Sequence, residues 1–161
     1  MSSEKSVIFI VEDDAAFNKL ISTYIKSKSE YEVYSYLSGE DCLEKIHKKP
    51  DLILMDYDLP FRDGIEVMGV VKKKYPDTIF IFLSGQTNVK VAVEAIKEGA
   101  FDYIVKDNQA KENALNKIDQ ILRYRKIMRE KELYRKAIFI VVTVLVLTWL
   151  ILFVNYQMNK V

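Results

Sequence analysis

The sequence predicts an α/β fold, a doubly wound parallel sheet of five strands, followed by an apolar helix. Two observations predict the sheet: short β-branched runs alternate with segments of helical periodicity, and several of these runs are apolar at every position. Strands that are buried on both faces have this composition, and they are typical of parallel sheets. A third observation, the absence of charge from Ala137 to Val154, predicts the terminal helix.

The elements follow one another as five strand–helix units. Fully apolar runs at 7–11, 52–55, 79–83 and 103–105 are expected in the middle of the sheet, and a more polar strand at 31–36 is expected at an edge. Helices are expected at 14–28, 39–47, 65–74 and 88–98, with a long one from about residue 111. Two apolar stripes are expected to cover the sheet: Phe17, Leu20, Ile21, Tyr24 and Ile25 on the first helix, and Val89, Val93 and Ile96 on the fourth.

Length and composition set limits on the kind of protein. With 161 residues, the chain has room for one ordinary globular domain besides its terminal apolar segment. The net charge of +1 gives no overall field that would attract nucleic acid. A single cysteine, Cys42, excludes an intramolecular disulfide, and the polar N-terminus does not resemble a signal peptide. We therefore expect the globular part in a reducing, cytosolic compartment.

Carboxylates gather after two of the predicted strands. Glu12 and Asp13 follow the first strand and Asp56 follows the third, and in open parallel sheets ligands bind at these carboxyl ends. If the two strands are neighbours, three such groups repel one another and need a cation, and oxygen ligands select a hard ion such as Mg2+. The alternative is that these acids only cap the first helix. Capping is the better interpretation for Asp14, and for the other three the residues alone leave both interpretations open.

Four motifs resemble the receiver domains of bacterial two-component response regulators, in particular those similar to chemotaxis regulators. They are Ile-Val-Glu-Asp-Asp at 10–14, Leu-Met-Asp at 54–56 with Leu-Pro at 59–60 and Asp-Gly at 63–64, Leu-Ser-Gly at 83–85, and Asp-Tyr-Ile-Val-Lys at 102–106. They occur in the family's order and spacing, and the resemblance covers residues 5–122. It implies a flavodoxin-like sheet with strand order 2-1-3-4-5.

The resemblance also implies a phosphoacceptor and a metal site. Asp56 would be the nucleophile that takes a phosphoryl group from a histidine kinase or a histidine phosphotransfer protein. Mg2+ would be held directly by Asp13, through water by Glu12, and by the backbone carbonyl of Asp58. The chain would assist its own phosphorylation and dephosphorylation in this way without being an enzyme that acts on a separate substrate.

The same resemblance implies a switch. Lys106 would supply an ammonium group to the phosphoryl oxygens, Ser84 would hydrogen-bond one of these oxygens, and Tyr103 would then rotate inward. Without the motifs, the three residues would be taken for a surface charge, a cap and an edge aromatic residue. The shifted surface would bind a downstream protein target that the sequence does not identify.

The chain departs from the family pattern at several positions. Lys106 is followed by Asp107, where most receivers have a proline after a cis peptide bond, and this puts the local geometry that aims Lys106 in doubt. Ser84 replaces the commoner threonine but keeps the hydroxyl group. Asp58 and Gln86 occupy positions that tune hydrolysis of the acyl phosphate in the family.

Three other features each allow a functional and a purely structural interpretation. His47, the only histidine, could relay a phosphoryl group, but a solvated helix end is the better interpretation. Cys42 is expected to be a small core residue. The basic segment 123–136 could bind nucleic acid, yet it also contains Glu130 and Glu132 and adjoins the apolar run. We therefore expect it to contact anionic lipid headgroups and expect no nucleic-acid partner.

The C-terminal part predicts a membrane topology. The 18 residues from Ala137 to Val154 would make about 27 Å of helix, which matches the hydrocarbon core of a bilayer. We expect a receiver at 5–122, a basic helical linker at 123–136, a transmembrane helix at 137–157 and a short tail at 158–161. Basic residues precede the apolar run, and only Lys160 follows it: Arg123, Arg125, Lys126, Arg129, Lys131, Arg135 and Lys136. The receiver is thus expected in the cytoplasm, with a single pass through the inner membrane and the C-terminus outside. The alternative is an apolar helix buried in the receiver or in an oligomer.

Three functions compete. The first is a phosphoacceptor receiver that works at a membrane, and the second is a degenerate receiver that serves as a membrane-tethered scaffold, for which Asp107 is the only support. The third is an enzyme on the same fold, such as a phosphatase or a nucleotide-binding protein. The sequence disfavours the third, because no glycine-rich loop follows the first strand.

Overall fold

A computed structural model describes residues 5–85 and 89–159 of the chain. Four features discussed above lie outside these residues: Gln86, the predicted start of the fourth helix at residue 88, the residues before Lys5, and Lys160. The chain divides into two compact units, one up to Asp119 and the other from Gln120. The first unit contains the sheet and the candidate site.

Five parallel strands form one sheet in the order β2-β1-β3-β4-β5, as the resemblance implies. The strands are β1 (Val7–Val11), β2 (Glu32–Tyr36), β3 (Leu52–Asp56), β4 (Ile79–Ser84) and β5 (Asp102–Val105). The expectation that β5 lies in the middle of the sheet was wrong, because it pairs only with β4 and forms an edge. Its apolar composition is explained by contact with the core, since Tyr103 packs against the central cluster and Ile104 is buried.

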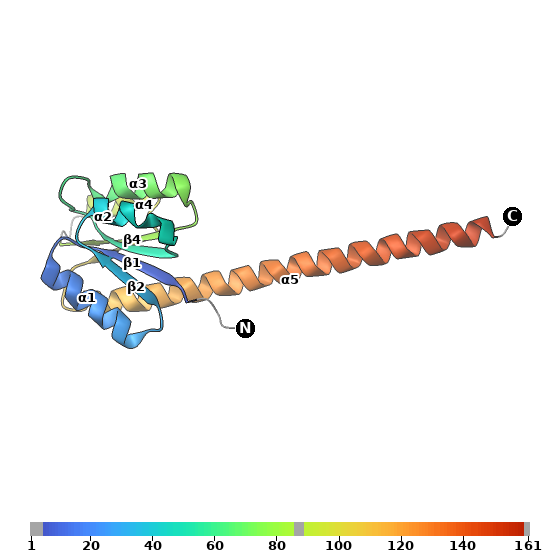
Figure 1. The fold of residues 1–161 in the computed structure, drawn as a ribbon, viewed down its shortest axis with the longest axis horizontal. Coiled ribbons are helices and arrows are strands. Elements are labelled where there is room, and N and C mark those ends of the chain that lie inside the picture. Colours follow the sequence, from blue (N-terminus) through green and yellow to red (C-terminus); the bar gives the residue numbers. More distant parts are fainter. Residues whose placement is uncertain (1–4, 86–88, 160–161) are drawn as a thin grey trace. The chain divides into compact units, whose positions relative to one another are not determined.

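The helices lie on both faces of the sheet. They are α1 (Ala15–Lys28), α2 (Gly39–Glu44), α3 (Gly64–Lys74), α4 (Val89–Lys97) and α5 (Ala110–Met158). Figure 1 shows α2, α3 and α4 above the sheet and α1 below it, where α5 begins. The second helix is shorter than predicted, because the chain tightens into a 3-10 turn at Ile46–Lys48. Lys49 then adopts a left-handed conformation (φ 52°), and Pro50 follows, so the helix cannot continue.

Side chains cap three of the helices. The Asp14 carboxylate accepts hydrogen bonds from the backbone N–H groups of Ala16 and Phe17, at 2.9 and 3.2 Å. Ser38 and Asp63 cap α2 and α3 in the same way. These contacts satisfy N–H groups that have no partner within the helix. The interpretation of Asp14 as a cap is confirmed.

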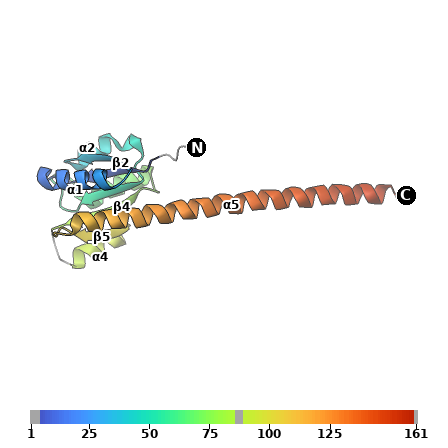
Figure 2. The same ribbon diagram turned by 90° about the horizontal axis from the view of Figure 1, so that it is seen from below.

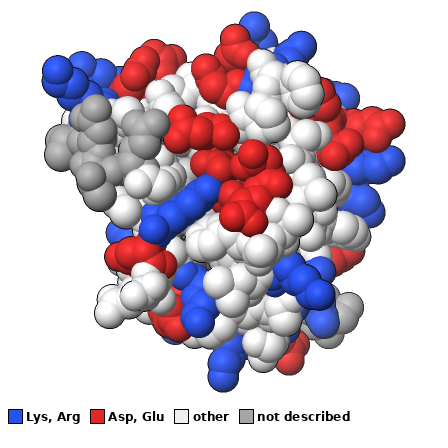
Figure 3. Space-filling view, turned by 90° about the vertical axis from the view of Figure 1, so that its left-hand side faces the viewer, with Lys and Arg blue, Asp and Glu red and all other residues white. Residues whose placement is uncertain are grey.

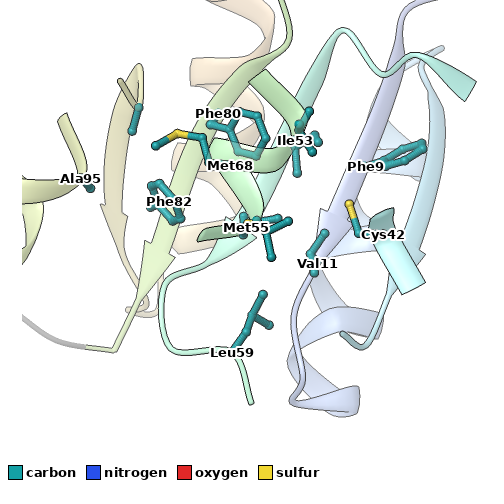
Figure 4. Close-up of a cluster of buried hydrophobic side chains, with 13 residues drawn as sticks. Phe9, Val11, Cys42, Ile53, Met55, Leu59, Met68, Phe80, Phe82 and Ala95 are labelled. Carbon is teal, nitrogen blue, oxygen red and sulfur yellow. The ribbon is translucent and has the colours of Figure 1, made fainter. Parts of the chain in front are cut away.

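The central core lies between the sheet and the α2–α4 layer (Figure 4). Alternate residues of three strands point into it: Phe9 and Val11, Ile53 and Met55, and Phe80 and Phe82. The intervening strand residues point to the other face, as the period of two requires. Cys42 is fully buried in this core, as predicted for a small core residue.

Two of the predicted apolar stripes were partly wrong. On α1 the predicted members Ile21 and Ile25 are fully buried, whereas Leu20 is 50% exposed. On α4, Val93 and Ile96 are each 45% exposed, while Ala95 is fully buried. Lys90, Glu94 and Lys97 mark the polar side of α4, but helical periodicity alone could not show which residues of the broad apolar side meet the sheet.

From Gln120 onward the second unit consists of one continuous helix that runs to the end of α5 (Figure 2). The predicted linker and the apolar run are therefore helical without a break. The apolar window of this helix is long and hydrophobic enough to cross a membrane, and none of it is buried in the structure. This criterion concerns length and composition only.

Candidate functional site

The predicted carboxylates meet at the carboxyl edge of the sheet. Glu12 and Asp13 follow β1, and Asp56 ends β3, its neighbour in the sheet. Each of the three offers an oxygen atom, and these oxygens all lie within 4.8 Å of one another. Glu12 and Asp56 are buried, whereas Asp13 is exposed. Figure 3 shows acidic side chains gathered in the middle of this face, with a basic side chain running into them.

Lys106 reaches this cluster from the end of β5. Its Nζ atom lies 2.6 Å from Oδ2 of Asp56, and 2.8 and 2.7 Å from the two carboxylate oxygens of Glu12. The backbone N–H of Lys106 donates to the Ser84 carbonyl at 2.8 Å, which fixes its starting point. No peptide bond among the described residues is cis, so Lys106 is aimed at Asp56 without the family's proline at position 107.

The backbone around Asp56 is tightly held. The N–H of Asp58 donates to Oδ1 of Asp56 at 3.1 Å, while Lys106 holds the other oxygen. Gly64 approaches this strand closely: a Cβ atom there would come within 2.6 Å of the Asp56 carbonyl oxygen and 2.5 Å of the Phe82 ring. A side chain at position 64 would displace the phosphoacceptor strand or the start of α3. The Asp-Gly pair at 63–64 is thus explained by a cap followed by a close contact.

Asn18 is a supporting residue that the sequence reasoning missed. Its side-chain amide is buried and donates to the carbonyl oxygens of Glu12 and Tyr36, at 3.0 and 2.7 Å. These bonds join the ends of β1 and β2 to the first turns of α1, behind the carboxylates. The sequence contained an indication of this role, because the polar residue Asn18 interrupts the buried face of α1, which continues at Ile21 and Ile25.

The carboxylates of the site carry more negative charge than the ammonium group of Lys106 compensates. Burial raises the pKa of Glu12 to about 7, the hydrogen bond from Lys106 opposes this rise, and the negative charge of Asp56 adds to it. For Lys106, burial alone would lower the pKa, but its hydrogen bonds to Asp56 and Glu12 outweigh burial and raise the pKa above its usual value. One ammonium group therefore compensates only part of the negative charge.

The donor set fits Mg2+. All three convergent side chains are carboxylates, and oxygen ligands are those that this hard ion prefers. The exposed position of Asp13 leaves one side of the cluster open to solvent, and Mg2+ usually keeps several of its water ligands.

The model of the Response regulator receiver domain family matches residues 8–119. The chain belongs to this family. Among its relatives, the chemotaxis protein CheY of Thermotoga maritima is 35% identical over 115 residues, which make up 69% of this chain and 96% of CheY. The luminescence regulatory protein LuxO of Vibrio campbellii is 34% identical over 102 residues, 63% of this chain, and the match spans only 22% of LuxO.

A solved structure supports the same assignment. The CheY-like receiver domain protein from Methanospirillum hungatei JF-1 superposes with a TM-score of 0.70 at 26% identity, over 78% of this chain and 99% of that one. The unit with the sheet is thus a receiver domain of a two-component response regulator, as the four motifs predicted. Receiver domains of this family typically bind Mg2+ at an acidic pocket, which agrees with the cluster described above.

The receiver domain places the predicted switch residues on its last two strands. Ser84 is fully buried at the end of β4, one register position beyond the Asp56–Leu83 pair. Tyr103 is half-buried on β5 and opposite Phe82. Asp58 is exposed beside the phosphoacceptor strand.

His47 is not one of the residues that form the carboxylate cluster. Its ring is exposed, and Nδ1 lies 3.2 Å from the carbonyl oxygen of Glu44 at the end of α2. This contact is what the interpretation of His47 as a helix-end residue requires.

Proposed function

We propose that this chain is a phosphoacceptor receiver that takes a phosphoryl group onto Asp56 and works at a membrane surface. The observation that carries the proposal is the contact of Lys106 with both Asp56 and Glu12, at 2.6 and 2.8 Å. It unites the ends of three strands, β1, β3 and β5, around one carboxylate. A surface lysine would be solvated, whereas the Lys106 side chain is only 18% exposed.

The reaction is a phosphoryl transfer. A carboxylate oxygen of Asp56 would attack phosphorus as the P–N bond of a phosphohistidine breaks, and the departing imidazole nitrogen keeps the electron pair and takes up a proton. The product is an acyl phosphate. Bound Mg2+ would neutralise the phosphoryl oxygens, held directly by Asp13, Asp56 and the carbonyl of Asp58, and through water by Glu12. The Lys106 ammonium would bind a phosphoryl oxygen in place of its present contact.

The phosphoryl group would then act on the switch. Ser84 would donate a hydrogen bond to it, the β4–α4 connection would move inward, and Tyr103 would follow. The changed surface would bind a downstream protein. The phosphodonor is a histidine kinase or a histidine phosphotransfer protein, in keeping with what receiver domains typically bind.

The scaffold alternative depends on Asp107 in place of the family's proline. The contact of Lys106 with Asp56 favours the phosphoacceptor over this alternative, because Lys106 reaches the carboxylate despite that change.

The membrane part of the proposal depends on the second unit. We expect residues 137–157 to cross the inner membrane once, with the basic segment 123–136 and the receiver in the cytoplasm. All large apolar side chains from Ile138 to Val154 are at least 44% exposed in the structure, and the length and composition of this part of the helix suit a membrane span. Tethering would raise the local concentration of the receiver beside a membrane-bound partner to about the millimolar range.

The test of phosphorylation uses full-length protein in detergent micelles. With Mg2+ and acetyl phosphate, the intact mass should rise by one phosphoryl group, and Asp56→Asn should abolish the increase. Asp77→Asn is the matched control, because Asp77 is exposed and precedes β4 at the opposite edge of the sheet. An Asp56→Asn protein that still gained this mass would show that the nucleophile is wrongly assigned.

A further inference from the structure

The helix beyond the receiver carries a stripe of mostly apolar, exposed positions that continues from the basic segment into the apolar run. Starting at Tyr124, positions at alternating steps of three and four residues fall on one stripe. Its members are Tyr124, Ile127, Lys131, Tyr134, Ile138, Val141, Leu145, Thr148, Leu152 and Asn155. Tyr124, Ile127 and Tyr134 are 63, 51 and 71% exposed, although they lie in the charged segment that precedes the apolar run.

This stripe differs from its neighbours in the basic segment. Three of its four positions from 124 to 134 are apolar, whereas the stripe through Met128 also contains Arg125, Glu132 and Arg135. Met128 and Leu133 are the other apolar residues of the segment, and neither lies on the stripe. Apolar side chains at steps of three and four on a helix that is otherwise mostly charged are the pattern of a two-stranded coiled coil. A helix that only linked the receiver to the membrane would have no need of them.

We propose that two copies of this chain associate in parallel through this stripe. The parallel direction rests on the proposed anchor, since two copies that cross one membrane with the same topology have helices pointing the same way. Lys131 is then a polar residue at a core position, of the kind that fixes register and favours a particular number of strands. Asn155 would occupy a stripe position at the other end of the span, where an amide can hydrogen-bond to its counterpart.

Charge complementarity at the edges of the stripe selects the same arrangement. In a parallel coiled coil, the residue directly before a stripe position that is followed by a step of three lies opposite the residue five places later on the other copy. Glu130 of one copy thereby faces Arg135 of the second copy, and the reverse pair forms on the other side. Within one helix these residues lie roughly 140° apart, so they cannot pair with each other.

The opposite side of the helix is already paired internally. Glu132 and Lys136 form an ion pair of 2.9 Å within one copy, four residues apart, and Lys136 lowers the pKa of Glu132. The two glutamates of the segment therefore have different roles. Glu132 stabilises the outer face of the helix, and Glu130 binds the second copy.

Cross-linking tests the stripe in full-length protein reconstituted in liposomes. In a Cys42→Ala background, Ile127→Cys and Tyr134→Cys should form intermolecular disulfides on oxidation with copper phenanthroline. The yield should exceed that of Arg129→Cys and Lys136→Cys by about tenfold, because a disulfide requires Cα atoms within about 7 Å. The two control positions also lie seven residues apart, on the outer face. Equal yields on both faces, or none on either, would overturn the proposal.

A charge exchange tests the pairing. Glu130→Arg and Arg135→Glu should each lower the association constant of two copies by about tenfold, measured by energy transfer between labelled copies. In each single variant, two pairs of like charges face each other. The double exchange should restore it, while Glu132→Arg should leave association unchanged. A double variant no better than the single variants would contradict the proposed register.

Failure of the anchor and failure of the dimer can be told apart. Carbonate washing of the same liposomes reports whether the helix is integral. If carbonate releases the protein, the anchor proposal fails, and the pattern of cross-links at 127–136 still decides association because these residues precede the apolar run. If the protein stays integral without selective cross-links, the dimer proposal fails alone.

Discussion

The loop after the phosphoacceptor contains a strained residue. Phe61 has a positive φ of 73° and is 94% exposed. It is the middle residue of a tight turn, because the N–H of Arg62 donates to the Pro60 carbonyl at 3.0 Å. Leu59 is buried on one side of this turn, and Asp63 caps α3 on the other, so the chain must reverse within a few residues. The fold imposes the strain on an aromatic residue that receives no packing in return.

Glycine at this position should therefore stabilise the receiver. Phe61→Gly is expected to raise the free energy of unfolding by about 1 kcal/mol, because a Cβ atom at positive φ costs that much. Urea unfolding of residues 1–136 measures the change. Phe61→Ala removes the ring but keeps the Cβ atom and is the matched control. If the glycine variant were no more stable than the alanine variant, the strain would be refuted.

The raised pKa of Glu12 has a consequence for metal binding. Burial raises the pKa of Glu12 to about 7, so protonation of this carboxyl group should compete with Mg2+ binding below pH 7. Affinity for Mg2+ should then rise by about tenfold per pH unit up to pH 7 and level off above it.

Calorimetry of Mg2+ binding in buffers of different ionisation enthalpy measures this proton release. Glu12→Gln should bind Mg2+ more weakly and with little dependence on pH in this range. A wild-type affinity that did not change between pH 5.5 and 7.5 would be incompatible with protonation of Glu12.

Of the two helices α3 and α4, α4 is held less firmly by the core. It buries Ala95, whereas α3 buries Val67, Met68 and Val71. Burial of a methyl group stabilises a helix far less than burial of branched side chains and a methionine. Weakly held elements are those that move in conformational switches, and α4 follows the strand that ends at Ser84.

Ser84→Ala should separate phosphorylation from this movement. Asp56 and Lys106 stay in place, so the variant should still be phosphorylated by acetyl phosphate. The chemical-shift change at Tyr103 on phosphorylation should be smaller than in the wild type, because the hydroxyl group that binds the phosphoryl oxygen is missing. Ser35→Ala, at an exposed position on β2, is the control. Shift changes of equal size in the wild type and Ser84→Ala would break the link between Ser84 and the switch.

At the scale of the whole molecule, the two units have opposite relations to solvent. The receiver encloses a buried apolar core, while the helix beyond Lys136 exposes all of its large apolar side chains. A contiguous apolar surface of this extent requires a membrane or a partner. Seven basic residues directly before it favour the cytoplasmic side for the receiver.

Truncation after Lys136 should separate the two units functionally. The truncated protein should be soluble and phosphorylated on Asp56, and it should signal weakly because the tether is lost. The full-length protein should stay in the membrane pellet after carbonate washing. Recovery of the full-length protein in the soluble fraction would rule out an integral anchor.

The sequence by itself determined the fold class and the carboxylates, because each depends on a local pattern: apolar strands, helix stops and the acidic residues at strand ends. The strand order came from the resemblance of the motifs to receiver domains, and local patterns alone misplaced β5. It also located the apolar helix. Tertiary structure decided what depends on residues far apart in the chain. Lys106 meets Glu12 across 94 positions, Asn18 ties β1 to β2, and α4 turns Ala95 rather than Val93 toward the sheet. Periodicity shows that a helix has an apolar face, but only packing against a particular neighbour shows which side chains that neighbour accepts.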